Sequence, residues 1–145
     1  MTADDIPAIL RIEEQLFSDP WPEFVFRDDV SSDFSYPFVI QLDNEIVGYV
    51  IMLVDENVGH LTNLAVVREY QRKSIAKNLL SYILRLAVGI GLARITLEVR
   101  LSNKTAVSLY ESFGFERLAV EKDYYRNPVE DGLIMVKDIF PDHDR

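Results

Sequence analysis

The stretch that most constrains the fold is residues 61–76, where an apolar run passes through a basic turn into a helix-like pattern. The turn and helix start carry Arg68, Arg72, Lys73 and Lys77 against the single Glu69. A strand that turns directly into a helix leaves backbone N–H groups free at the helix N-terminus. These N–H groups and the local positive charge together predict a binding site for an anion such as a phosphate.

This basic turn stands out because the chain as a whole is acidic, with a formal net charge of −9. Such a charge argues against nucleic acid as a partner, since nucleic-acid affinity depends on neutralising phosphates. The absence of cysteine excludes disulfides, thiolate metal sites and a thiol nucleophile. His60 and His143 are the two histidines and lie far apart in sequence, so we expect no metal site.

The chain has the length and composition of one ordinary globular domain. Its 145 residues are 48% hydrophobic and 27% charged, without an interdomain linker or repeat. No apolar run reaches the roughly 18 residues of a membrane span, and the N-terminus lacks a signal-peptide pattern. We therefore expect a single domain over residues 1–145, no membrane association and a cytoplasmic location.

Hydrophobic periodicity predicts the element order ααβββαβαββ, which is an α/β arrangement of a mixed sheet packed by helices. The first helix starts after Thr2 and ends before Asp19, and a short second helix over 23–30 is expected to turn Phe24 inward. Three strands in an antiparallel meander follow, and residues 123–128 are predicted to form a loop. The expected strands are 36–42, 46–54, 60–67, 94–101, 115–120 and 133–136, and the later helices are 75–90 and 103–113.

Four sequence blocks, in this order and spacing, together resemble the GNAT acetyltransferases, and among them the RimI-type N-terminal amino-acid acetyltransferases. The blocks are 63–66, 71–76, 97–103 and 109–115. The resemblance implies a central, mostly antiparallel sheet with parallel pairing after the cofactor-binding strand, flanked by about four helices. It also implies acetyl-CoA as co-substrate and the N-terminus of a protein, such as a ribosomal protein alanine, as acceptor.

The resemblance assigns acetyl-CoA to the basic turn between the third strand and the following helix. Residues 71–76 match the family's pyrophosphate-binding turn, the strand before it offers backbone groups to the pantetheine arm, and Asn103 contacts that arm from the other side. The implied cofactor residues are Leu64, Ala65, Val66, Gln71, Arg72, Lys73, Ser74, Ile75, Ala76, Lys77 and Asn103.

Two departures from the family pattern are visible. Ser74 replaces the first glycine of the turn, where a missing side chain lets the backbone approach phosphate closely. Serine is also a preferred helix N-cap and its hydroxyl can donate to an anion, so we expect binding to survive with changed affinity. Family members usually begin with an edge strand before the first helix, whereas this sequence starts almost at the helix cap. Either that strand precedes this sequence or it is missing, and a strand at residues 1–3 would be marginal.

Acetyl transfer to an amine needs a group that removes a proton and a group that protonates the departing thiolate. With no cysteine to carry the acetyl group, direct attack in a ternary complex is expected. Glu98 and Tyr110 have the spacing of the RimI-type general base and general acid, and Glu23 matches a rival base in the first loop of related enzymes. From the residues alone, Glu98 could instead be a surface carboxylate paired with Arg100, and Tyr110 a core aromatic.

The resemblance also assigns a substrate site. Tyr124 and Tyr125 match the paired tyrosines that hold a substrate N-terminus, and Trp21 and Tyr36 could form the opposite wall or be plain core aromatics. His60 is expected to be a structural residue at a strand end. Acetylation of a small amine or a protein lysine, and a non-catalytic acyl-CoA-binding module, remain open as alternatives.

Overall fold

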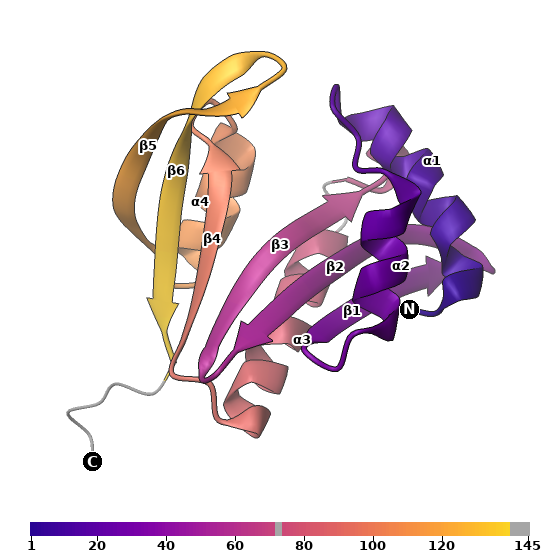
Figure 1. Cartoon of the computed structure of the whole chain (residues 1–145), viewed down its shortest axis with the longest axis horizontal. Coiled ribbons are helices and arrows are strands. Elements are labelled where there is room, and N and C mark those ends of the chain that lie inside the picture. Colours follow the sequence, from indigo (N-terminus) through magenta and orange to yellow (C-terminus); the bar gives the residue numbers. More distant parts are fainter. Residues whose placement is uncertain (72–73, 140–145) are drawn as a thin grey trace.

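The computed structural model describes residues 1–71 and 74–139 and contains the predicted order of elements (Figure 1). Each helix and strand begins and ends within a few residues of its expected position, with the exception of the two C-terminal strands. The elements are α1 (Ile6–Leu16), α2 (Glu23–Ser31), β1 (Ser35–Leu42), β2 (Glu45–Asp55), β3 (Val58–Val66), α3 (Ile75–Ile90), β4 (Arg94–Arg100), α4 (Lys104–Ser112), β5 (Glu116–Arg126) and β6 (Val129–Asp138).

The described strands form one six-stranded mixed sheet in the order β1-β2-β3-β4-β6-β5. The first three strands form the predicted antiparallel meander, and α3 then crosses over so that β4 pairs parallel with β3. The remaining pairs, β4 with β6 and β6 with β5, are antiparallel. The α/β class and the mixed sheet expected from the sequence are confirmed.

Helices cover both faces of this sheet, and each face has its own core. Helices α1 and α2 bury Ile9 and Phe26 against Tyr49 and Ile51 of β2. On the opposite face α3 buries its apolar stripe against alternate residues of the same strand, including Val50 and Met52. Strand β2 is therefore apolar on both sides, which is typical of a central strand.

The prediction that Phe24 faces inward is wrong. Its side chain is 64% exposed, whereas Phe26 is fully buried against Trp21 and Tyr49. Residues two apart lie on nearly opposite faces of a helix, so the prediction turned the wrong face of α2 toward the core.

Strands β3 and β4 pair only at one end. Their ladder joins residues 58–61 to residues 94–97 and stops at Leu61 opposite Leu97. On the other side of β3, Leu61 pairs with Met52 but Asn63 pairs with Ile51, so Thr62 is one extra residue in the strand. Such a bulge bends a strand and increases its twist, and beyond it β3 and β4 diverge like the arms of a V (Figure 1).

The predicted loop at residues 123–128 is largely strand, which corrects the sequence interpretation. Strand β5 continues to Arg126, and only the short turn before Val129 separates it from β6. Its pairing shifts between Glu121 and Tyr125, and Asp123 has a left-handed φ of 54°. This irregularity breaks the alternation of apolar and polar residues by which a strand is recognised in sequence.

The N-terminal residues contain no strand, in agreement with the expectation from residues 1–3. Ala3–Asp5 form a short 3-10 turn, in which the Thr2 N–H donates to Asp5 Oδ2 at 2.8 Å. No helix in the described ranges is both long and apolar enough to cross a bilayer.

Candidate active site

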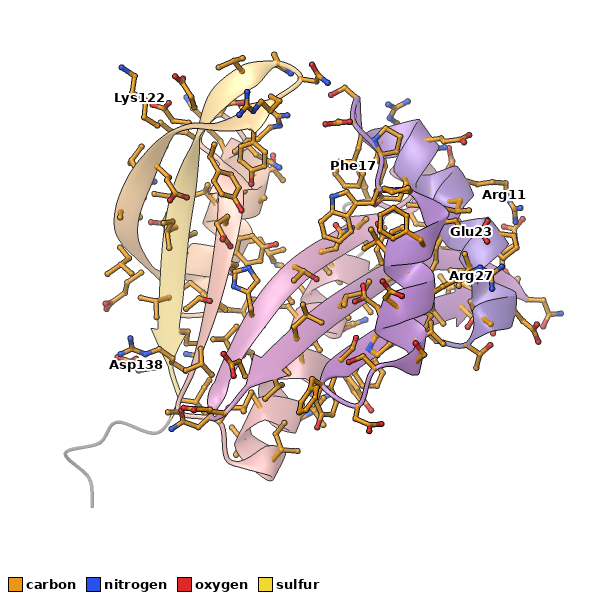
Figure 2. All side chains as sticks on the ribbon, in the orientation of Figure 1. Arg11, Phe17, Glu23, Arg27, Lys122 and Asp138 are labelled. Carbon is orange, nitrogen blue, oxygen red and sulfur yellow. The ribbon has the colours of Figure 1, made fainter. Side chains whose placement is uncertain are left out.

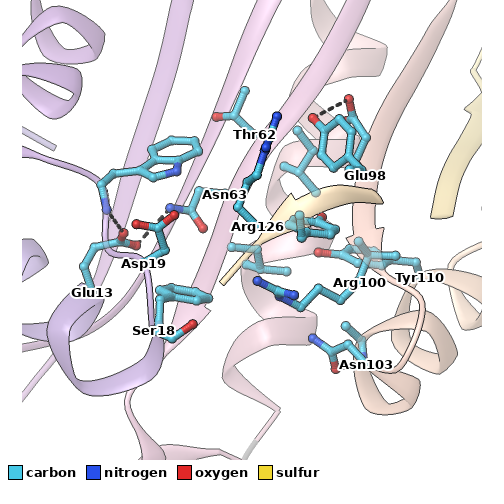
Figure 3. A pocket seen from close by; sticks show the side chains of 18 residues that line it. Glu13, Ser18, Asp19, Thr62, Asn63, Glu98, Arg100, Asn103, Tyr110 and Arg126 are labelled. Atoms are coloured by element: carbon cyan, nitrogen blue, oxygen red, sulfur yellow. Dashed lines mark hydrogen bonds between the residues drawn. The ribbon is translucent and has the colours of Figure 1, made fainter. Parts of the chain in front are cut away.

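A cleft of about 420 Å³ lies where β3 and β4 diverge (Figure 3). One wall comes from residues 61–64 of β3 and the end of α1 with its following loop. The other wall comes from residues 98–100 of β4, from α4 and from residues 124–126 of β5. The cleft therefore brings together Glu98, Tyr110, Asn103, Trp21, Tyr124 and Tyr125, which were predicted as site residues from separate parts of the sequence.

The Glu98 carboxylate is held on both sides by side chains from other strands. His60 on β3 places Nε2 2.8 Å from Oε2, and the Tyr124 hydroxyl donates to Oε1 at 3.3 Å. The Glu98 side chain is only 20% exposed. Its expected partner Arg100 lies elsewhere, against the β5–β6 hairpin. The surface ion pair considered from the sequence is therefore absent, and Glu98 faces the cleft.

Tyr110 lies on α4, where its ring is 8% exposed and packs edge-on against Phe115. Burial raises the pKa of Tyr110 to about 12. Its hydroxyl therefore keeps its proton at neutral pH and can donate it into the cleft. The core role considered from the sequence is met, because the ring packs in the main core, and Tyr110 also lines the cleft. Its role as a general acid stays a prediction.

The two tyrosines of β5 form the outer part of the same wall. Their rings meet edge-to-face with centroids 4.9 Å apart, and the guanidinium of Arg100 lies 4.5 Å from the centre of the Tyr125 ring. Arg100 also donates to the carbonyl oxygens of Asn127 and Pro128 and to Glu130. This set of contacts fixes the β5–β6 hairpin beside Glu98.

Glu13 is a cleft residue that the sequence analysis missed. It is 1% exposed on α1, and its carboxyl group accepts hydrogen bonds from the Trp21 N–H at 2.9 Å, the Asn63 side chain at 3.0 Å and the Tyr49 hydroxyl. Burial, and then the adjacent Glu13, raise the pKa of Tyr49. Glu13 therefore joins the loop that carries Trp21 to strands β2 and β3.

The predicted rival base and one predicted substrate residue lie outside the cleft. Glu23 points away from it on α2 and forms an ion pair with Arg27 at the surface (Figure 2). Tyr36 lies on β1, at the edge of the sheet, and packs partly buried against the main core. The structure thus does not bring either residue to Glu98.

The predicted pyrophosphate turn has the backbone form that glycine favours. Ser74 is the N-cap of α3 and has left-handed dihedral angles, with φ of 68° and ψ of 11°. The Gln71 side chain donates to the Val66 carbonyl at 2.9 Å and so ties the turn to the end of β3. Ile75 is buried, Ala76 is partly buried and Lys77 is exposed; Arg72 and Lys73 lie outside the described residues.

The β3 edge that faces the cleft has no strand partner among the described residues beyond Leu61. Leu64, Ala65 and Val66 pair with β2 on their other side only. Across the cleft, Asn103 is the N-cap of α4 and its Oδ1 accepts from the Ala106 N–H at 3.2 Å. An extended chain with amide groups could therefore add to β3 as another strand does.

Comparison with known proteins agrees with this geometry. The family described as Acetyltransferase (GNAT) matches residues 6–115, which is more than half of the chain. The chain belongs to the GNAT acetyltransferase family. The matched residues of this GNAT chain include β3, the turn before α3, β4 and α4, which together carry most of the cleft.

Curated relatives of this GNAT acetyltransferase include the ribosomal protein bS18-alanine N-acetyltransferase of Escherichia coli, which is 32% identical over 88% of this chain and 84% of that protein. An N-alpha-acetyltransferase of Saccharolobus solfataricus is 31% identical over 92% and 87% of the two chains. The crystal structure of the E. coli ribosomal-protein-S18-alanine N-acetyltransferase has a TM-score of 0.91 and 30% identity, covering 97% of this chain and 92% of that one.

GNAT acetyltransferases use acetyl-CoA, and the residues present in this chain fit that co-substrate. The open edge of β3 suits the amide groups of pantetheine, and the left-handed turn at Ser74 leads into the N-terminus of a 16-residue helix, which suits a pyrophosphate. The predicted family and its use of acetyl-CoA are confirmed.

Proposed function

We propose that this protein acetylates the N-terminal α-amine of a protein, as the names of its E. coli and archaeal relatives state for those enzymes. The observation that carries the proposal is that Glu98 and Tyr110 line one cleft beside the free edge of β3. A carboxylate and a protonated phenol are thereby available next to the strand along which acetyl-CoA would lie.

The reaction is a direct transfer within a ternary complex. Glu98 removes a proton from the substrate ammonium, directly or through a water, and the amine nitrogen attacks the thioester carbonyl carbon. The carbon–sulfur bond then breaks and Tyr110 gives its proton to the thiolate of CoA. The nitrogen loses its second proton as the amide forms, and this proton restores the Tyr110 hydroxyl. Because burial raises the pKa of Tyr110, its hydroxyl is protonated at neutral pH and has a proton to give.

Three aromatic residues support a peptide acceptor. Tyr124 and Tyr125 on one wall and Trp21 on the other flank the opening of the cleft next to Glu98. An α-amine has an ordinary pKa near ~8 against ~10.4 for lysine, so its deprotonation costs roughly 3 kcal/mol less at neutral pH. Both features favour a protein N-terminus over a lysine side chain.

Steady-state kinetics with peptides that carry a free or a blocked N-terminus test this proposal. We expect Glu98→Gln and Tyr110→Phe each to lower kcat by about 10²–10⁴-fold, the usual contribution of general acid–base groups. Glu23→Gln is the matched control, since Glu23 is a surface carboxylate outside the cleft, and it should stay within about twofold of the unmodified protein. Equal CoA release from N-terminally blocked peptides with an internal lysine would overturn the proposed substrate.

A further inference from the structure

His60 has a partner on each ring nitrogen, and both partners lie on β4. Nε2 is 2.8 Å from Glu98 Oε2, and Nδ1 is 2.8 Å from Thr96 Oγ1. His60 and Thr96 are also directly paired in the β3–β4 ladder, one step before its end. The Thr96 hydroxyl, the imidazole and the Glu98 carboxylate therefore form a continuous chain across the two strands.

The hydrogen-bond chemistry of these three groups fixes the position of one proton. An ionised carboxylate only accepts, so Nε2 must carry the proton of the His60–Glu98 contact. Nδ1 can then be bare and accept from the Thr96 hydroxyl, or carry a second proton and donate to it, since a hydroxyl does both. The same geometry accommodates a neutral and a cationic His60 without rearrangement.

The two charge states of His60 act differently on Glu98. Neutral His60 orients the carboxylate and leaves its charge available to the substrate ammonium. Cationic His60 compensates that charge and places a second positive group where the ammonium must approach, and like charges so close oppose each other. We propose that His60 positions the base Glu98 and makes acetyl transfer depend on pH, with the neutral imidazole as the active form.

This inference rests on the proposed function, in which Glu98 is the base. In the described part of the chain, Tyr124 and Tyr125 on β5 and Arg100 on β4 lie around the Glu98 end of the pair, and Glu121 and Tyr110 act on the two tyrosines. Burial is the first cause that raises the pKa of both tyrosines, so each keeps its proton near neutral pH. Arg100 keeps its charge and is bound to the β5–β6 hairpin. Histidine is the side chain that ordinarily changes charge between about pH 5 and 8.

The kinetic test uses His60→Gln, whose amide can donate to Glu98 but cannot become cationic, and His60→Phe, which keeps an aromatic ring but cannot donate. At acidic pH, log(kcat/KM) of the unmodified protein should rise by up to two units per pH unit. One unit comes from deprotonation of the substrate amine and one from deprotonation of His60. In His60→Gln this slope should fall to about one, with activity at alkaline pH within about threefold of the unmodified protein. His60→Phe should lose tenfold or more at every pH. An unchanged acid slope in His60→Gln overturns the inference.

A second measurement does not depend on turnover. The sequence contains two histidines, so the imidazole NMR signal that is missing in His60→Gln identifies His60. We expect the pH dependence of this signal to differ between the unmodified protein and Glu98→Gln, because the imidazole and the Glu98 carboxylate are in direct contact. An identical titration in both proteins overturns the inference. Full activity of Glu98→Gln would instead overturn the proposed function, and the NMR comparison would still report on the coupling.

Discussion

Glu13 has an unusual position for a carboxylate, because it is almost completely buried beneath the loop that carries Trp21. A buried carboxyl group is tolerated only when its oxygens are fully hydrogen-bonded. Three donors from α1–α2, β2 and β3 meet this condition at Glu13. The residue therefore stabilises the fold and positions one wall of the cleft at the same time.

We predict that Glu13→Ala lowers the free energy of unfolding by about 2–4 kcal/mol, because it leaves buried donors on Tyr49 and Asn63 without their acceptor. Urea denaturation measures this change. Glu14→Ala is the matched control, since Glu14 is the next residue on the same helix and is exposed, and its effect should stay within about 0.5 kcal/mol. Equal effects of the two substitutions would contradict this role of Glu13.

A signal for Glu13 exists in the sequence. Glu13 lies four residues after Ile9 and three before Leu16, on the apolar stripe of the first helix, where a charged residue is out of place. The stripe thus indicates burial of Glu13. Its partners could not be predicted in this way, because Tyr49 and Asn63 come from two strands whose register is set by the tertiary structure.

Ser74 is a second residue whose backbone differs from what its side chain prefers. A left-handed conformation costs a non-glycine residue of order 1 kcal/mol, and glycine adopts it without this cost. We predict that Ser74→Gly raises the free energy of unfolding by about 0.5–1 kcal/mol, the gain being reduced by the greater freedom of glycine in the unfolded chain. Thermal unfolding measures the stability, and calorimetric titration with CoA should show tighter binding because the backbone can approach the pyrophosphate more closely.

Ser81→Gly is a control in the same helix, and its expected effect on stability has the opposite sign. Ser81 lies inside α3, so glycine there should destabilise the protein by about 0.5–1 kcal/mol. If both serine-to-glycine changes destabilise equally, the left-handed turn is not a source of strain in this protein.

Among the elements, the β5–β6 hairpin determines where Tyr124 meets Glu98. A Cβ atom placed on Gly132 of β6 would lie 2.9 Å from the Tyr124 Cβ and 3.0 Å from two atoms of its ring. Gly132 therefore leaves the space that the Tyr124 side chain occupies. Glycine is needed here because a larger side chain would clash, and not because the backbone forms a turn.

We predict that Gly132→Ala displaces Tyr124 and lowers kcat/KM about tenfold, because a shift of about 1 Å in a positioning group is enough for a large loss. Peptide acetylation assays measure this loss. Gly89→Ala is the control, since nothing lies within 4 Å of a Cβ atom at Gly89 in α3, and it should leave activity unchanged and slightly raise stability. Unchanged kinetics of Gly132→Ala would show that the position of Tyr124 is unimportant.

The order and type of the elements could be predicted from the sequence because long, regular periodicity dominates most of them. The prediction was wrong where regularity is interrupted. In β5 the irregular pairing around Asp123 hides a strand that is exposed along almost its whole length. Residues 123–128 therefore look like a loop in sequence, although residues 123–126 belong to β5. The assignment of residues 124 and 125 to the substrate site rests on the family resemblance and stays a prediction.

At the scale of the whole molecule, the ladder between β3 and β4, which joins the β1–β3 half of the sheet to the β4–β6 half, has four residue pairs among the described residues. Acetyl-CoA in the cleft would contact both halves, from the edge of β3 to the start of α4. A ligand that binds only the folded protein stabilises it by RT ln(1 + [L]/Kd), which is about 2.7 kcal/mol at a hundredfold excess over Kd.

We predict that saturating CoA raises the melting temperature and slows amide hydrogen exchange, most of all in residues 62–66 of β3, whose edge is otherwise open. Mass-spectrometric exchange with and without CoA measures this effect. The edge strand β1, on the far side of β2, serves as the internal reference and should change little. Equal protection of β1 and β3 would contradict binding along the open edge.

The topology was accessible from the sequence because a helix between two strands implies a parallel crossover. The divergence of β3 and β4 was not accessible, because it follows from one extra residue, Thr62, whose presence in the strand changes no periodicity that the sequence displays. The cleft itself is a result of that divergence.

The position of His60 and Thr96 near the last paired rung has a mechanical consequence. In a V-shaped body, any change in the angle between the arms moves the tips furthest and the vertex least. The anchored end of the Glu98 side chain sits close to this pivot, whereas the α1–α2 loop and the β5–β6 turn lie at the far ends of opposite arms. Between these far ends the Ser18 hydroxyl donates to the Asn127 carbonyl oxygen, so the width of the opening is held at the tips as well as at the vertex.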